Sequence, residues 1–181
     1  MIFFGMEEDP KARYCPRSPR VICLDQSNPS RREAKATDSF YRDWFAAWMQ
    51  GMGQLTETQR APVFQSCGKN CARPCILPLY QRMLKQAKNP DSFFVQIDRD
   101  VEDVTVRVEK PGKVYDFYYV RCLCPIYEEC GVDNGLLCEC SLESLRYVMR
   151  ELFPAAPPQV ELLTSVLRGD PECRFRIAFP E

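Results

Sequence analysis

The sequence predicts an α+β domain in which a helical N-terminal half packs on a small antiparallel sheet of about four strands. Apolar residues recur at helical spacing through the first half of the chain, which predicts several helices there. In the second half, apolar residues alternate with polar ones on both sides of the turns at 111–112 and 168–171, which predicts two β-hairpins. Helices and strands therefore occupy different parts of one chain, and this separation is typical of α+β rather than α/β proteins.

The N-terminal residues 1–37 carry four prolines and little periodicity, which predicts an irregular arm ahead of a single domain at 38–181. The helical part of that domain is expected at 38–90. Its first helix begins near Asp38 and ends at Gly51 to Gly53, the second runs from the cap Thr56 to about Asn70, and the third follows Pro74.

The part expected to hold the sheet is 91–181, arranged as hairpin, helix and hairpin. The first hairpin joins strands near Val104–Val108 and Val114–Val120. A helix capped at Ser141 follows and ends before Pro154, and the last hairpin joins Val160–Leu167 to Cys173–Phe179.

Composition narrows the chemistry, because the 181 residues include eleven cysteines and no histidine. Without imidazole, one chain can form no Cys-His or Ser-His catalytic pair and no mixed Cys/His zinc site. The 24 basic residues nearly balance the 25 acidic ones, so we expect no nucleic acid and no membrane as partner. The N-terminus lacks the features of a signal peptide, which predicts a cytoplasmic protein with mostly reduced thiols.

Two Cys-x-Cys pairs form the strongest candidate metal site. Cys122 and Cys124 are separated from Cys138 and Cys140 by 13 residues, and four thiolates could surround one tetrahedral Zn²⁺. An Fe–S cluster is a second candidate for the same four sulfurs. In a strand, side chains at positions i and i+2 point to the same face, whereas those at i and i+1 point to opposite faces. A turn is therefore needed to bring the four sulfurs together around one ion. The alternative is that some of the four cysteines pack as buried fillers.

A second cysteine cluster lies on the predicted second helix. Cys67 and Cys71 are four residues apart, so their thiols would lie one turn apart on the same helix face. They could share a metal, form a redox pair or act as catalytic nucleophiles, with Glu or Asp as the base in the absence of histidine. Cys75, the third member of the cluster, is expected to pack as a buried side chain.

Aromatic side chains are the candidates for a ligand pocket. Trp44 and Trp48 lie on the predicted first helix, and Tyr118 lies on the strand at 114–120. Aromatic residues at this spacing also fit a plain hydrophobic core. Because that strand carries apolar residues on both faces, both faces should be covered, and a homodimer is one explanation.

The C-terminal hairpin carries a Gly-Asp-Pro-x-Cys-x-Phe motif, formed by Gly169, Asp170, Pro171, Cys173 and Phe175. With the preceding helix, this motif makes the segment from about 90 to 181 resemble the 4-vinyl reductase domain family. The resemblance implies a fold shared with nitric-oxide-signalling and Golgi-transport ligand domains, in which helices and a small sheet enclose an apolar pocket. Ser165 stands where that family usually has a further cysteine, so we expect Cys173 to be a small buried hydrophobe rather than a ligand.

A Cys-Gly-x-x-Cys-Ala helix followed by Cys-x-Cys-Pro and Cys-x-Cys-Ser elements is similar to a group of bacterial cysteine-rich proteins named as aminothiazoline-carboxylate hydrolase-like. This resemblance implies either of two functions. The first is a binding or sensory module for a small organic ligand, with a thiolate metal or redox site. The second is a cysteine- or metal-dependent hydrolase acting on a small heterocyclic or thioester-like substrate.

Overall fold

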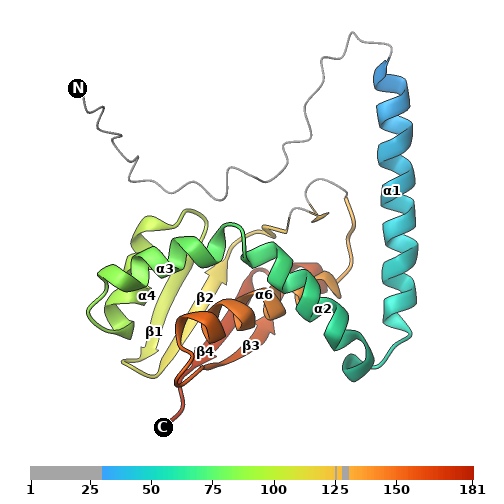
Figure 1. Ribbon diagram of the computed structural model, residues 1–181. Coiled ribbons are helices and arrows are strands. Elements are labelled where there is room, and N and C mark those ends of the chain that lie inside the picture. The colour runs from blue at the N-terminus through green and yellow to red at the C-terminus, as the bar shows by residue number, and fades with distance from the viewer. Residues whose placement is uncertain (1–29, 125, 128–130) are drawn as a thin grey trace, which may run out of the picture.

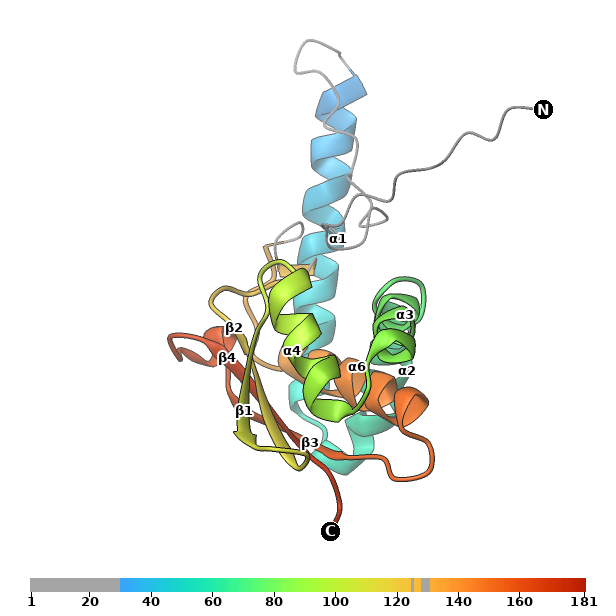
Figure 2. The same cartoon turned by 90° about the vertical axis from the view of Figure 1, so that its left-hand side faces the viewer.

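The computed structural model describes residues 30–124, 126–127 and 131–181, so most of the expected N-terminal arm lies outside the described residues. The described chain confirms the α+β class. One antiparallel sheet of four strands, in the order β1-β2-β4-β3, is covered by helices on one face (Figures 1 and 2). Within the described residues, no helix is long and apolar enough to cross a membrane.

The first helix, α1, spans Ser30–Gly53 and begins well before the predicted start near Asp38. The expectation of an irregular arm was therefore wrong for residues 30–37. This stretch has no apolar periodicity, but it consists largely of arginine, glutamate, alanine and lysine, which have high helix propensity. Apolar periodicity detects only helices with an apolar stripe in their sequence, and this stretch has none.

The next two helices agree with the sequence. Helix α2 spans Glu57–Ala72, and its predicted cap Thr56 accepts a hydrogen bond from the backbone N–H of Gln59 at 3.3 Å. The Gln59 side chain accepts a bond from the Thr56 backbone in return, which completes a capping box. Helix α3 spans Ile76–Gln86.

Helix α4, at Pro90–Asp100, was not predicted from the sequence. Its start signal is local, because Asn89 caps the backbone N–H of Ser92 at 2.8 Å and proline occupies the first helical position. Its driving force is tertiary, because Phe93 and Phe94 are fully buried under the sheet.

The sheet is built from two hairpins, as the sequence predicts. The first joins β1 at Thr105–Lys110 to β2 at Val114–Tyr119, and the second joins β3 at Gln159–Thr164 to β4 at Cys173–Ala178. The hairpins pair through β2 and β4 in antiparallel register. β4 thus lies between β2 and β3, which makes the two C-terminal strands part of one sheet with the first hairpin.

The main core lies between the sheet and the helices α3, α4 and α6. Phe94 stacks on Tyr115 of β2 with ring centroids 3.9 Å apart, and both side chains are fully buried. The Tyr115 hydroxyl donates a hydrogen bond to Asp91 at the start of α4. Burial and this bond raise the pKa of Tyr115 above its ordinary value, so the phenol stays protonated and ties α4 to the hairpin.

On the opposite face of the sheet, no helix of the described residues covers the strands, yet a charge is buried there (Figure 2). Asp116 of β2 is 0% exposed, and its carboxylate accepts hydrogen bonds from the guanidinium groups of Arg174 and Arg176 on β4. Next to it, Tyr118 is buried because Arg107 and Arg174 lie over its ring, at 4.5 and 5.2 Å from the centroid. Paired strands therefore cover this face with their own arginine side chains.

A second hydrophobic cluster joins the C-terminal half of α1 to the rest of the domain. Its buried members are Met49, Met52, Phe64, Val132 and Leu137. Helix α6, which contributes Leu137, spans Leu137–Leu152 rather than starting at the predicted cap Ser141. Asn134 makes the turn that precedes α6, since its side chain and backbone oxygens accept from the N–H groups of residues 136 and 137.

Candidate functional site: a cluster of free thiols

The described chain gathers its free cysteines around the crossing of α2 and α6. They come from four segments: α2, the residues after β2, the first turn of α6 and the start of β4. The free cysteines are Cys67, Cys71, Cys122, Cys124, Cys138, Cys140 and Cys173. Cys75, between α2 and α3, is disulfide-bonded and half-buried, so it is not a free buried thiol as the sequence had suggested.

The crossing of α2 and α6 is unusually close at Gly68. A Cβ atom added there would lie 2.5 Å from the backbone nitrogen of Ser144, 2.7 Å from the carbonyl carbon of Glu143 and 2.9 Å from the carbonyl oxygen of Cys140. All three contacts are backbone atoms that no side-chain rotation can move. The glycine lets the two helix backbones touch, and it thereby brings the cysteines of α2 next to those of α6.

Four of the thiols form an outer group, defined as Cys67, Cys71, Cys124 and Cys140. Cys71 is close enough to Cys124 and Cys67 for their charges to affect it. Cys140 is in turn affected by Cys71, Cys67 and Cys124. Cys124 and Cys140 also pack against the second hydrophobic cluster, under the C-terminal half of α1. The outer group therefore combines one helix, one loop and the first turn of another helix.

The remaining three free thiols form an inner group, defined as Cys122, Cys138 and Cys173, and all three are buried. The sulfur of Cys138 shares a hydrogen bond with the hydroxyl of Ser165 at 2.7 Å. The backbone N–H of Val166 donates to the sulfur of Cys173 at 3.4 Å. The expectation that Cys173 packs as a buried side chain is confirmed, and Ser165, fully buried, acts as a partner of a thiol.

The two groups divide each predicted Cys-x-Cys pair. Cys140 lies within electrostatic range of the two thiols of α2, whereas Cys122 and Cys138 lie within range of Cys173. Cys124 lies within range of members of both groups. For Cys138 and Cys140 the cause is helical geometry, because residues two apart on a helix lie on opposite sides. The sequence had not placed these two cysteines on a helix, and so it had not paired Cys140 with Cys67 and Cys71.

Burial keeps the thiols of Cys122, Cys138 and Cys140 protonated near neutral pH. It raises the pKa of Cys140 to about 12, with further contributions from the neighbouring thiols and Glu143. Burial is also the main cause of the raised pKa of Cys122, about 11. The pKa of Cys71 is raised by local desolvation of its sulfur, although the residue as a whole is exposed at the surface. Among the described residues, no cation lowers the pKa of Cys71 or Cys140, whereas Arg168 acts on Cys138 in this sense.

Glu143 adds a buried carboxylate to the site, one helical turn after Cys140. One of its oxygens, Oε1, accepts a hydrogen bond from Arg146 at 2.7 Å. The other, Oε2, is buried and has no hydrogen-bond partner within the described part of the chain. Sequence reasoning did not single out Glu143; the available signal was its spacing of three residues from Cys140 on a helix.

The predicted zinc site at Cys122, Cys124, Cys138 and Cys140 stays a prediction. In their present positions, no three or more cysteine, aspartate or glutamate side chains of the described chain form a group that could hold a metal ion. An Fe–S cluster on the same four residues likewise stays a prediction.

The structure does not bring the three predicted pocket aromatics together. Trp44 is 57% exposed on α1. Trp48 packs against the second hydrophobic cluster, and Tyr118 lies on the far face of the sheet beneath Arg107 and Arg174. A shared ligand pocket of these three side chains is not formed, because the sheet face that holds Tyr118 is turned away from the helices.

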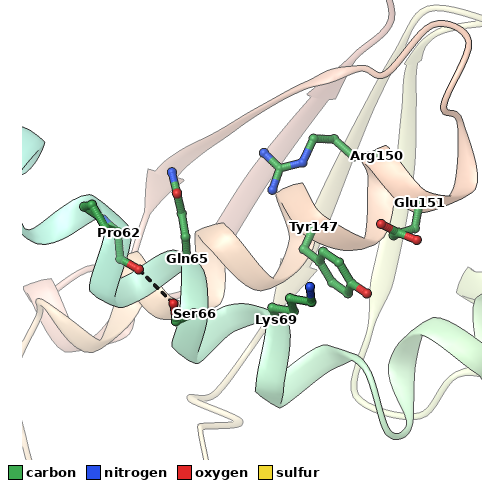
Figure 3. A pocket seen from close by; sticks show the side chains of 7 residues that line it. All are labelled: Pro62, Gln65, Ser66, Lys69, Tyr147, Arg150 and Glu151. Carbon is green, nitrogen blue, oxygen red and sulfur yellow. Dashed lines mark hydrogen bonds between the residues drawn. The ribbon is translucent and has the colours of Figure 1, made fainter.

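The described surface also contains an open groove of about 460 Å³ between α2 and α6 (Figure 3). One stripe of α2 and one stripe of α6 line it: Pro62, Gln65, Ser66, Lys69, Tyr147, Arg150 and Glu151. Its lining is polar and charged, unlike the apolar pocket that the family resemblance implies.

Comparison with known proteins identifies no family. No protein-family model matches the chain, and no curated protein matches it. A search of solved structures finds similarity to a trafficking protein particle complex subunit 3 from Naegleria fowleri covalently bound to palmitic acid, with a TM-score of 0.39 and 12% identity over 81% of this chain and 97% of that one. A similarity at this level carries no argument about function.

The raised pKa values predict slow alkylation of the buried thiols. In native protein at pH 7.5, Cys67 should react with iodoacetamide first, because it is exposed, and Cys140 and Cys122 should react at least about 100 times more slowly, because only the thiolate reacts. The rates for Cys140 and Cys122 should rise with pH throughout the range 7 to 10. Mass spectrometry of time-resolved labelling would measure this, and equal rates for all thiols would contradict the described burial.

Proposed function

We propose that the chain is a small binding or sensory module whose functional centre is the outer thiol group, and that this group takes up a soft divalent metal ion, with zinc as the first candidate. The observation that supports the proposal is the convergence of four free thiols from three segments beside a buried carboxylate oxygen that has no hydrogen-bond partner among the described residues. Thiolates are strong ligands of zinc, and four of them satisfy its usual coordination number.

The electrostatics of the outer thiol group favours binding of a cation. Ionised neighbours in the outer group raise the pKa of Cys71 and Cys140, and desolvation adds to the cost of their charged forms. A bound dication would reverse both effects, because a coordinated thiol is deprotonated. Uptake requires the thiols to move closer together than they stand in the described structure.

The decisive experiment measures metal stoichiometry in anaerobically purified protein, before and after zinc is supplied and excess is removed. We expect about one zinc per chain and masking of four thiols until denaturation. The variants Cys67→Ser and Cys71→Ser should lose the metal, while Cys122→Ser and Cys138→Ser should keep it.

The variants also separate this proposal from the site predicted from sequence, since Cys124 and Cys140 belong to both sets. The opposite result would assign the metal to the two Cys-x-Cys pairs: zinc would be lost in Cys122→Ser and Cys138→Ser and retained in Cys67→Ser and Cys71→Ser. Zinc bound to none of these proteins would overturn both assignments. Cys173→Ser is the matched control, because Cys173 is a free thiol outside both sets.

A hydrolase is the second candidate, and the unpartnered Oε2 of Glu143 is the observation that favours it. In this function Glu143 would accept the proton of a neighbouring thiol as its sulfur attacks a thioester carbonyl, and return the proton to the departing thiolate before water cleaves the acyl-enzyme. The sequence suggested Cys67 or Cys71 as nucleophile, whereas the described proximity of Glu143 is to Cys140. A burst of product from a chromogenic thioester, lost in Glu143→Gln and in one cysteine variant, would support this function.

A further inference from the structure

The groove between α2 and α6 presents hydrogen-bond donors on both sides. Lys69 and Gln65 project from α2, and the guanidinium group of Arg150 projects from α6 toward them (Figure 3). The ammonium group of Lys69 lies 5.7 Å from the centroid of the Tyr147 ring. The groove therefore combines two positive groups, one amide and an aromatic wall.

These positive groups are not neutralised within the described chain. Neither Lys69 nor Arg150 forms an ion pair with a described carboxylate, although Arg150 is adjacent in sequence to Glu151. In the groove, the Ser66 hydroxyl donates to the Pro62 carbonyl at 3.1 Å, so its oxygen remains free to accept. The lining thus offers two cationic donors, Lys69 and Arg150, and one acidic side chain, Glu151, while Ser66 contributes no free donor.

The arrangement has a regular structural basis. The four lining residues of α2 follow the pattern i, i+3, i+4, i+7, and the three of α6 follow i, i+3, i+4, so each set forms one stripe along its helix. The close crossing at Gly68, one residue before Lys69, fixes α2 against α6 beside the two stripes. The positions of Lys69 and Arg150 are therefore set by rigid helices rather than by a loop.

The geometry points to a binding site for a small organic anion, a carboxylate or phosphate group attached to a flat apolar part. The two cations would bind the anionic oxygens with charge-assisted hydrogen bonds, and the ring of Tyr147 would contact the apolar part. The volume of about 460 Å³ is within the range of small-molecule sites. This site is separate from the thiol group and does not depend on the proposed metal.

Titration of the full-length protein with phenyl phosphate, followed by NMR, tests this inference. We expect amide shifts confined to α2 and α6 and an affinity that falls as salt increases. Lys69→Gln and Arg150→Gln should each weaken binding about tenfold, because each removes a charged hydrogen-bonding group. Glu151→Gln should strengthen it, since the substitution removes the only negative charge in the groove lining.

Lys85→Gln provides the matched control, because Lys85 is an exposed lysine on α3 outside the groove, and it should leave the affinity unchanged. Benzylammonium, with the same ring and the opposite charge, should not bind. Inorganic phosphate should bind more weakly than phenyl phosphate if Tyr147 contributes. Three results would overturn the inference, whatever the metal content of the protein. They are the absence of amide shifts in folded protein, equal binding of benzylammonium, and undiminished binding of phenyl phosphate to the Lys69→Gln, Arg150→Gln double variant.

Discussion

Replacing Gly68 by alanine is expected to lower the free energy of unfolding by about 2 kcal/mol or more, although alanine favours helices. The added methyl group would meet three backbone atoms of α6 at less than 3.0 Å, so the helices must move apart. The separation would also open the outer thiol group. Urea unfolding would measure the loss of stability, and alkylation of Cys140 in the native state should become faster.

Gly51→Ala is the control for this substitution. Gly51 is also helical, but nothing lies within 4 Å of a Cβ atom at that position. Alanine there should be neutral or raise stability by about 0.5 kcal/mol, because it reduces the conformational freedom of the unfolded chain. If both glycine variants had the same stability, the close crossing of α2 and α6 would not be a feature of the folded protein.

Removing both arginines that face Asp116 is expected to have an even larger effect. In the Arg174→Met, Arg176→Met double variant, a carboxylate that is 0% exposed would lose both cations that donate to it. Leaving a buried charge without a partner costs about 3–5 kcal/mol. Arg99→Met is the control, because the Arg99–Asp100 pair is exposed and should contribute less than about 1 kcal/mol. Equal stability of the two variants would contradict the described network.

The same network predicts how stability depends on pH. Burial by itself would raise the pKa of Asp116, but the hydrogen bonds and charges of Arg176 and Arg174 outweigh it and hold the pKa below its ordinary value of 3.8. A lowered folded-state pKa means that the unfolded chain binds more protons in this range. The contribution of the network is therefore complete above pH 3.8 and is lost as the pH falls through the folded-state pKa. The double arginine variant should have a lower free energy of unfolding than the parent protein at neutral pH, and this difference should become smaller as the pH is lowered below 3.8.

Local patterns predicted most of the elements, with identifiable failures. The alternation of valines at 104–108 and the turn at Gly112 were sufficient for the first hairpin, because residues in a half-buried strand follow a period of two. Helix α4 was missed because its main determinant is not local: it is the burial of Phe93 and Phe94 against the sheet. The early start of α6 was missed because its turn depends on Asn134 rather than on a serine cap.

For this protein, the sequence by itself determined the α+β class, the two hairpins and the restriction to sulfur and carboxylate chemistry, because these follow from periodicity, turn residues and the absence of histidine. The tertiary structure alone decided which thiols are neighbours. Cys140 meets Cys67 and Cys71 because a glycine allows two helices to touch, and the buried oxygen of Glu143 and the Lys69–Arg150 groove arise at the same crossing. Such juxtapositions depend on contacts between residues about 70 to 80 positions apart, which no local pattern encodes.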